Sequence, residues 1–409
     1  MTQALTFDIL REAVNESAAL RWRARLQPAG GPGDKVFPPT YEGGEYALES
    51  RVVDGRRVPG VLLDSVQSQA NRMEMALLEA HRAERIHLPL VEVRFEGELA
   101  DVGTITSLEA PHRIADAILR DSRLGGERFR DTEEGRVLDS ASIANCTALF
   151  GLCPTALIFG LWDSTGPLGG LGTKFQRTVV GEIIGVDIET GVRPSSRIDP
   201  LGIQLNAGPL YQLEEGGWTL DPAEAVQAKG KAVTVGKEGK PSEANHGNVT
   251  PSLRNERKQP HHGGVTMDHA LHTVVVSLPA LRRLRFPLGG LTSAAQAKTN
   301  LEAQTALAAL AVCAASLSVS HGCDLRSRCL LVPEPGQAGW ELVGADGTVS
   351  SFSLTSKQAC SLLNDAVRAA VTAGLPWRKE PVVLQPSPGL AELVRRSRAL
   401  AMQGAAEEG

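Results

Sequence analysis

Residues 62–75, LLDSVQSQANRMEM, combine an apolar helical spacing with polar groups that could bind an anion. Leu63, Val66, Ala70 and Met73 recur at the spacing of one helix face. The other faces carry the hydroxyl, amide and guanidinium groups of Ser65, Gln67, Ser68, Gln69, Asn71 and Arg72. Because the first amide protons of a helix lack partners within it and its dipole favours negative charge there, these groups could bind phosphates.

The same helix start also has a purely structural interpretation. Asp64 or Ser65 could be the N-cap and accept the first amide protons itself. The helix would then be a capped surface helix whose polar face meets solvent. Periodicity alone leaves both interpretations open.

A second segment, residues 162–177 with the sequence WDSTGPLGGLGTKFQR, places glycines ahead of two cations. Its candidate residues are Gly166, Gly169, Gly170, Lys174 and Arg177. Glycine lets a backbone approach a phosphate closely, and the cations would neutralise it. The order Gly172-Thr173-Lys174, followed by a strand pattern, argues against a nucleotide-hydrolysing P-loop. We expect a loop along a polyanion backbone, with a flexible connection between strands as the alternative.

The third candidate is a local excess of positive charge at residues 229–258. Seven Lys and Arg stand there against three Glu, an excess of 7 − 3 = 4, although the whole chain carries a net charge of −5. Its candidate binding residues are Lys229, Lys231, Arg254, Arg257 and Lys258. The segment could follow a nucleic acid with salt-dependent affinity, or it could be a solvated, partly disordered loop. The acidic balance of the chain argues against nucleic-acid binding unless a local patch supplies the charge.

Groups for metal or acid–base chemistry are sparse. The histidines form no H-E-x-x-H motif, and the sequence around Cys323 and Cys329 lacks a fourth ligand at zinc spacing. The possible metal ligands considered are His261, His262, His269, His272 and His321 with these two thiols. Asp163 is the one carboxylate that we would test for cleavage. We therefore predict no metal, no cofactor and no enzymatic activity.

The elements that must position these groups are predicted to be mixed helices and strands. Helices are expected over 1–27, from 62 onward, within 108–150, over 291–318 and over 357–373. Strands are expected over 88–97, 155–164, 177–189, 272–278 and 328–334. A hairpin is expected around Asp54-Gly55. Single strands separated by helices and long loops are typical of an α+β fold.

The most apolar segment, residues 305–319, is shorter than the roughly 20 residues that a membrane helix needs. We expect a buried helix there, with Leu307, Leu310, Ala314 and Leu317 on its inner stripe. The chain start lacks the basic and apolar regions of an export signal, and its six cysteines are scattered, so we expect reduced, buried thiols and a cytoplasmic protein.

Three segments together resemble a known family. Residues 62–75 resemble the serine–glutamine–arginine stretch of CRISPR RAMP backbone proteins. Residues 159–189 and 322–334 are more specifically similar to the backbone RAMP subunit, of the Cas-seven-like family, in type I-G (formerly I-U) CRISPR interference complexes. The resemblance covers roughly residues 40–385, although Arg72 lies one position later than its counterpart in better-known relatives.

The resemblance implies a hand-shaped α+β protein with a ferredoxin-like, RRM-type palm, helical fingers and an inserted thumb loop. The expected parts are 1–211 and 265–388 for the palm with its finger insertions, 212–264 for the thumb and 389–409 for a C-terminal helix and acidic tail. Copies would stack along one CRISPR RNA in a type I surveillance (Cascade) complex and present it to the target DNA strand. Further expected partners are the large subunit and the fused guide-processing, end-capping subunit, with no membrane.

The resemblance also implies roles for the candidate residues. The polar residues of the 62–75 segment would bind guide phosphates, the glycine-rich loop would face the guide backbone, and the basic segment would belong to the thumb. The alternative function is a metal-dependent endoribonuclease of the RAMP superfamily that uses Asp163 or the histidines.

Overall fold

The computed structural model describes residues 3–53, 55–164, 172–253 and 262–408. The chain forms two compact units. The first comprises residues 1–189 and 266–390, and the second comprises 190–265 and 391–409. Each unit is described by itself.

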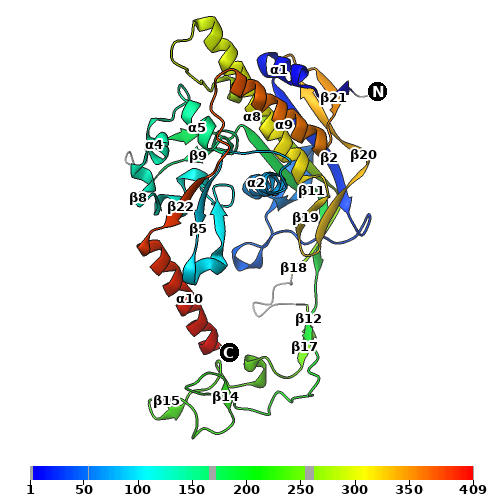
Figure 1. Cartoon of the computed structure of the whole chain (residues 1–409). Helices are drawn as coiled ribbons and strands as arrows, with labels where there is room; N and C mark the ends of the chain where they lie inside the picture. The colour runs from blue at the N-terminus through cyan, green and yellow to red at the C-terminus, as the bar shows by residue number, and fades with distance from the viewer. Residues whose placement is uncertain (1–2, 54, 165–171, 254–261, 409) are drawn as a thin grey trace. The chain divides into compact units, whose positions relative to one another are not determined.

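A large sheet forms the framework of the first unit (Figure 1). Among the described residues it has nine strands in the order β1-β21-β20-β2-β18-β11-β4-β3, with β19 paired to β20. Their bounds are β1 Gln3–Ala4, β2 Ala19–Pro28, β3 Leu48–Val53, β4 Arg56–Asp64, β11 Val179–Val192, β18 His262–Ser277, β19 Cys323–Arg326, β20 Cys329–Val343 and β21 Val349–Ser353. Neighbouring strands such as β2 and β18 run antiparallel, whereas β1 and β21 are parallel.

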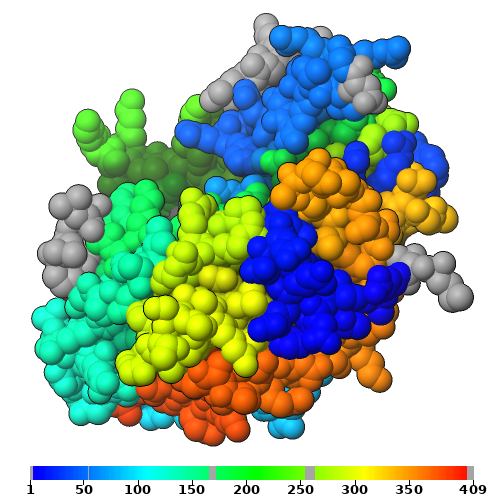
Figure 2. Space-filling model, turned by 90° about the horizontal axis from the view of Figure 1, so that it is seen from above, coloured from blue at the N-terminus to red at the C-terminus, as the bar shows by residue number. Residues whose placement is uncertain are grey.

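Long helices cover one face of this sheet (Figure 1). They are α1 Phe7–Glu16, α2 Val66–Arg82, α8 Ser293–Ser318 and α9 Ser356–Thr372, and the short α7 spans Leu278–Arg282. In the space-filling view the blue N-terminal segment that contains α1 lies against the yellow segment that contains α8 (Figure 2). Helix α8 is therefore surrounded by protein along most of its length.

The burial of α8 explains its apolar composition. It is long and apolar enough to cross a membrane, but 89% of its most apolar window is buried inside the protein. Leu307, Leu310 and Ala314 are fully buried and Leu317 is 6% exposed. The prediction of a buried helix with this stripe is confirmed.

A smaller group of elements completes the first unit. A second sheet has the order β6-β5-β22-β7-β8, and β9 pairs with β10 in a separate two-stranded ribbon. The bounds are β5 Val91–Arg94, β6 Thr104–Thr106, β7 Ser122–Leu124, β8 Glu127–Arg128, β9 Leu161–Trp162, β10 Lys174–Phe175, β22 Val382–Pro386, α3 Ala117–Arg120, α4 Glu133–Ser140, α5 Thr147–Leu152 and α6 Thr155–Phe159. Short 3-10 helices are η1 Glu42–Gly44, η2 Gly97–Val102, η3 Arg113–Ala115 and η4 Phe129–Asp131.

The second unit carries short hairpins and one long helix. Its paired strands are β12 Ser195–Arg197 with β17 Val249–Ser252, β13 Tyr211–Gln212 with β14 Trp218–Thr219, and β15 Gln227–Ala228 with β16 Lys231–Ala232. It also contains η6 Pro241–Ala244 and most of α10, Pro388–Glu408. The lack of apolar periodicity over residues 212–264 fits such short, mostly exposed elements.

Two secondary-structure predictions are wrong. The helix expected over 1–27 ends at Glu16, and RWRAR lies in β2, where the buried Leu20, Ala24 and Leu26 alternate with arginines. The strand expected over 155–164 is the helix α6 followed by the two-residue β9. A short, wholly apolar run is buried on every side in either conformation, so periodicity cannot distinguish them.

The other main predictions agree with the structure. The hairpin around residues 54 and 55 is β3–β4, and residue 54 itself lies outside the described residues. Helices α8 and α9 and strands β5 and β11 lie where the sequence predicts them, whereas β18 begins earlier than predicted, at His262, and β20 continues beyond the prediction to Val343. The fold is mixed α+β, as expected.

A buried ion pair joins α2 to the smaller group of elements. Arg113 donates from Nε to Glu74 Oε1 at 2.6 Å and from Nη2 to Oε2 at 2.9 Å, and its Nη1 donates to the Gly160 carbonyl at 3.1 Å. The side chains of Glu74 and Arg113 are only 3% and 10% exposed. Each charge is therefore tolerated in the interior because the other neutralises it.

We expect Glu74→Ala to lower the free energy of unfolding by about 3–5 kcal/mol, because it leaves a guanidinium buried without its carboxylate. Arg113→Ala should have a comparable effect, and the double variant should cost less than the sum of the two. Chemical denaturation measures all three. Arg368→Ala removes an exposed pair with Asp365 and should cost less than about 1 kcal/mol. Additive costs for Glu74 and Arg113 would contradict this account.

Candidate nucleic-acid interface

The start of α2 follows directly from the end of β4. Asp64 is the last residue of the strand and is 1% exposed. Ser65 is the N-cap, and its hydroxyl accepts a hydrogen bond from the Ser68 amide at 3.3 Å. The structure thus selects Ser65 rather than Asp64 as the cap and leaves the Asp64 carboxylate available for other donors.

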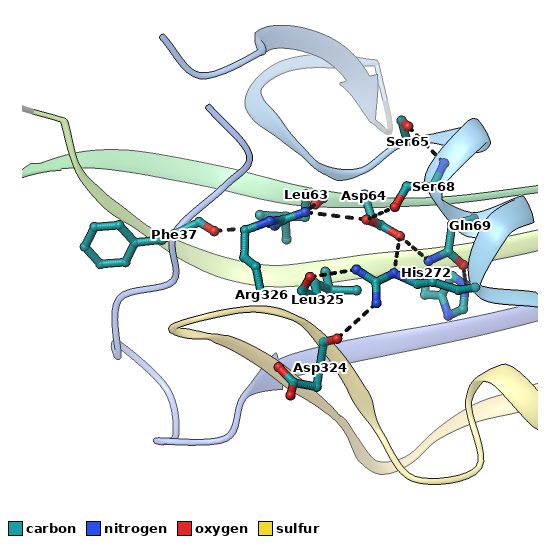
Figure 3. Close-up of polar contacts among 11 residues, drawn as sticks. Phe37, Leu63, Asp64, Ser65, Ser68, Gln69, His272, Asp324, Leu325 and Arg326 are labelled. Carbon is teal, nitrogen blue, oxygen red and sulfur yellow. Dashed lines mark hydrogen bonds and ion pairs between the residues drawn. The ribbon is translucent and has the colours of Figure 1, made fainter. Parts of the chain in front are cut away.

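The Asp64 carboxylate is the centre of a hydrogen-bond network (Figure 3). It accepts from Ser68 Oγ at 2.8 Å, from Gln69 Nε2 at 2.6 Å and from Arg72 Nε at 2.9 Å. The Arg326 guanidinium lies 3.5 Å from its other side. We call these five residues the Asp64 network. Burial of a carboxylate is costly, and here two guanidiniums and two neutral donors offset that cost.

The two arginines also fasten the β19–β20 hairpin, Arg72 to α2 and Arg326 to β4 (Figure 3). Arg72 donates to the carbonyls of Asp324 at 3.0 Å and Leu325 at 2.7 Å. Arg326 donates to the Leu63 carbonyl at 2.7 Å. Two positive charges share one negative charge, and the side chains of Arg72 and Arg326 remain 33% and 26% exposed. The start of α2 therefore carries local positive charge that reaches solvent.

His272 of β18 supports the network from the interior. Its Nε2 lies 2.9 Å from Gln69 Oε1, and because the Gln69 amide donates to Asp64, this contact makes His272 the donor. Burial lowers the pKa of His272 to about 4, although the charge of Asp64 acts in the opposite direction. The imidazole is thus neutral at physiological pH and holds the Gln69 amide in one orientation.

The polar residues predicted on α2 have different surroundings. Gln67 and Asn71 are exposed, and Ser65 and Ser68 are half-buried. Gln69 is buried and uses both ends of its amide inside the protein, so it supports the site instead of facing a ligand. The periodicity of the sequence could not reveal this difference, because the Asp64 and His272 contacts depend on the strands.

The remaining predicted binding residues lie in other parts of the fold. Lys174 and Arg177 are exposed, and Lys174 lies in β10 with its Nζ 5.2 Å from the Trp162 ring centroid. Lys229 and Lys231 are exposed at the β15–β16 hairpin of the second unit. The residues that lie outside those that the structure describes are Gly166, Gly169, Gly170, Arg254, Arg257 and Lys258.

Arg326 and Arg328 are basic residues that the sequence prediction did not assign. Arg328 has a left-handed backbone, with φ 58°, and its guanidinium lies 4.6 Å from the centroid of the Phe37 ring. Arg326 is the last residue of β19, and Arg328 lies in the turn that leads to β20. The segment 322–334 was recognised as distinctive, and its R-S-R spacing at a hairpin is the signal that could have identified them.

Asp163, His269 and His272, which were considered for catalysis or metal binding, contact other protein groups, and His261 lies outside the described residues. Asp163 is 4% exposed, and its carboxylate pairs with Arg130 at 2.8 Å. His269 pairs with Asp268. Burial raises the pKa of Cys323 and of Cys329 to about 11, which disfavours the thiolate that zinc needs. Within the described part of the chain no group of three or more His, Cys, Asp or Glu could hold a metal.

Comparison with known proteins agrees with the resemblance that the sequence predicts. Residues 20–190 match the family model of CRISPR-associated protein GSU0053 (Cas_GSU0053). This match covers 171 of the 409 residues and supports the expectation of a CRISPR-associated protein. The matched CRISPR-associated region runs from β2 into β11 and includes Asp64, the whole of α2 and the β9–β10 ribbon.

Among solved structures, the chain is similar to the crystal structure of Thermofilum pendens Csc2. The sequence identity is 13% and the TM-score is 0.25, with 90% of this chain and 75% of that chain covered. No curated protein matches the sequence.

We expect Asp64→Asn to lower the free energy of unfolding by about 3 kcal/mol, because an amide nitrogen would replace an acceptor that faces several donors. Asp365→Asn on α9 is the matched control, since its carboxylate is half-exposed, and it should change stability by less than about 0.5 kcal/mol. Chemical denaturation measures both variants. Equal stabilities of the two variants would remove Asp64 from its central role.

His272 should make stability depend on pH. Its pKa of about 4 in the fold lies below its ordinary value of 6.5, so the unfolded chain takes up this proton first as pH falls. Stability should therefore decline between pH 6.5 and 4, by about 3 kcal/mol for this group in total. His272→Gln should show a shallower decline when unfolding is measured at several pH values. Identical slopes for the two proteins would contradict the assignment.

Proposed function

We propose that this protein is a non-catalytic, RNA-binding backbone subunit of a type I CRISPR surveillance complex. The observation that carries the proposal is the Asp64 network, whose members other than Arg326 lie in a region that matches a CRISPR-associated family. Two arginines around one carboxylate leave net positive charge beside the N-terminus of α2, where backbone amides and the helix dipole favour an anion. A guide phosphate has the charge and the acceptors that such a site fits.

The chemistry of the surrounding residues supports a strand rather than an isolated phosphate. Gln67 and Asn71 are exposed hydrogen-bond donors, and Arg326 and Arg328 bring cations from the adjacent hairpin. Lys174 and Arg177 add exposed cations beside the glycine-rich segment. Contacts to phosphates hold a strand without reading its sequence, so the bases stay available for pairing with target DNA.

The finer architecture is part of the same proposal. We propose that the sheet and its helices form a ferredoxin-like palm with finger insertions, from residues 1–211 and 265–388. Residues 212–264 would be the thumb, and the exposed Lys229 and Lys231 on its short hairpins support this assignment. Residues 389–409 would form the separate C-terminal helix.

The partners follow from the proposed role. Copies of the chain would assemble as a filament along the CRISPR RNA in the cytoplasm, together with the large subunit and the fused guide-processing, end-capping subunit. Contacts between copies could pair acidic with basic faces, so an overall charge of −5 is compatible with a positive groove. The alternative of a metal-dependent endoribonuclease gains no support from Asp163, whose carboxylate is buried against Arg130.

Co-expression with a CRISPR array tests the proposal, and nucleic acid should co-purify with the protein. Lys174→Ala should weaken guide binding to a similar degree for unrelated spacer sequences, because phosphates carry no sequence information. It should also reduce the slope of log affinity against log salt by about 0.7, the value for one phosphate on a single strand. Filter binding at several salt concentrations measures both effects.

Lys357→Ala, at an exposed lysine of α9, is the charge-matched control and should leave binding unchanged. A protein that purifies with the ultraviolet spectrum of bare polypeptide would contradict RNA binding. A Lys174 variant that altered spacer preference would contradict its assigned phosphate contact. Metal-dependent RNA cleavage that Asp163→Ala abolishes would instead favour the endoribonuclease.

A further inference from the structure

The two-stranded ribbon of β9 and β10 has distinct inner and outer faces. Leu161 pairs with Phe175, and Trp162 pairs with Lys174. Leu161 and Phe175 are 6% and 5% exposed, whereas Trp162 is 54% exposed and Lys174 is also exposed. Because side chains alternate along a strand, the first pair anchors the ribbon in the core and the second projects outward.

Trp162 and Lys174 form a preordered pair on the outer face. The Lys174 Nζ lies over the indole ring, 5.2 Å from its centroid, at cation–π distance. By contrast, Trp340 and Trp377 are 2% and 8% exposed and belong to the core. The half-exposed Trp162 indole, with the Lys174 cation over its ring, therefore offers an aromatic surface to solvent.

The ribbon beneath this pair is firmly held. The Asp163 carboxylate pairs with Arg130, and the Asp163 amide donates to the Thr173 carbonyl at 2.9 Å. The Thr173 hydroxyl donates to the carbonyls of Leu138 and Ala141 at the end of α4. These contacts give Asp163 a positioning role and fix the place from which Trp162 projects.

We propose that Trp162 stacks on an unpaired base of the bound single-stranded RNA while Lys174 contacts the neighbouring phosphate. The inference rests on the proposed function and names a residue that the binding prediction did not include. Stacking on an aromatic ring accepts any base, because every base has a π face, and therefore it suits a subunit that must hold unrelated guides. Because Trp162 is 54% exposed with the cation already over its ring, indole surface remains accessible to a base.

Binding of a single-stranded RNA of mixed sequence to the full-length protein tests this inference. Trp162→Leu should weaken binding roughly 5- to 150-fold, as expected for the loss of one stacked base, whereas Trp162→Phe should retain most of the affinity. Neither variant should alter the salt slope, which separates stacking from the phosphate contact of Lys174. Leucine keeps the apolar character of the site and removes only the aromatic ring.

Fluorescence gives a second readout that does not depend on the leucine variant folding. RNA should quench the indole emission of the wild-type protein, and the Trp162→Phe protein should lose most of that quenching. If the wild-type and Trp162→Leu proteins bound RNA with equal affinity, this inference would be overturned and the proposed function would stand. Equal quenching of the wild-type and Trp162→Phe proteins by RNA would have the same consequence. No RNA binding by the wild-type protein would contradict the proposed function itself.

Discussion

A single carboxylate, that of Asp64, has to be neutralised in the interior before α2 can start where it does. It lies at the junction of strand β4, the second strand from one edge of the sheet, and the helix α2, and it is almost completely buried. Arg72 and Arg326 neutralise the carboxylate from two directions. His272 orients the Gln69 amide, which donates a further hydrogen bond to Asp64. Because the buried carboxylate must be neutralised, two guanidiniums lie at the helix N-terminus. Their surplus positive charge would attract an anionic ligand.

This arrangement reconciles an acidic chain with a proposed RNA-binding role. The net charge of −5 describes the whole surface, whereas binding depends on the potential at one groove. The β9–β10 ribbon would add an aromatic contact, through Trp162, to the electrostatic attraction. A phosphate contact weakens with salt while an aromatic contact does not, so a surface that offers both would hold a strand over a wider range of conditions than charge alone allows.

The sequence predicted the elements whose signals are local. The helix α2, the buried helix α8 and the main strands follow from periodicity, and residue type limits the cap of α2 to Asp64 or Ser65, between which the structure selects Ser65. The failures occurred where the local signal is ambiguous, as in α6, whose residues are all buried. The candidate site was only half predictable, because Arg326 meets Asp64 across 262 residues of chain and no spacing rule connects them.

The 262-residue separation of Asp64 and Arg326 in the sequence has a consequence for biosynthesis. The Asp64 network is complete only when Arg326 of β19 reaches Asp64, so a ribosome must translate beyond residue 326 before the network exists. Until then Asp64 has only Arg72 as a cationic partner, and the helix start lacks the second guanidinium that gives it surplus positive charge. Under the proposed function, translation order would therefore delay RNA capture until the β19–β20 hairpin has been made.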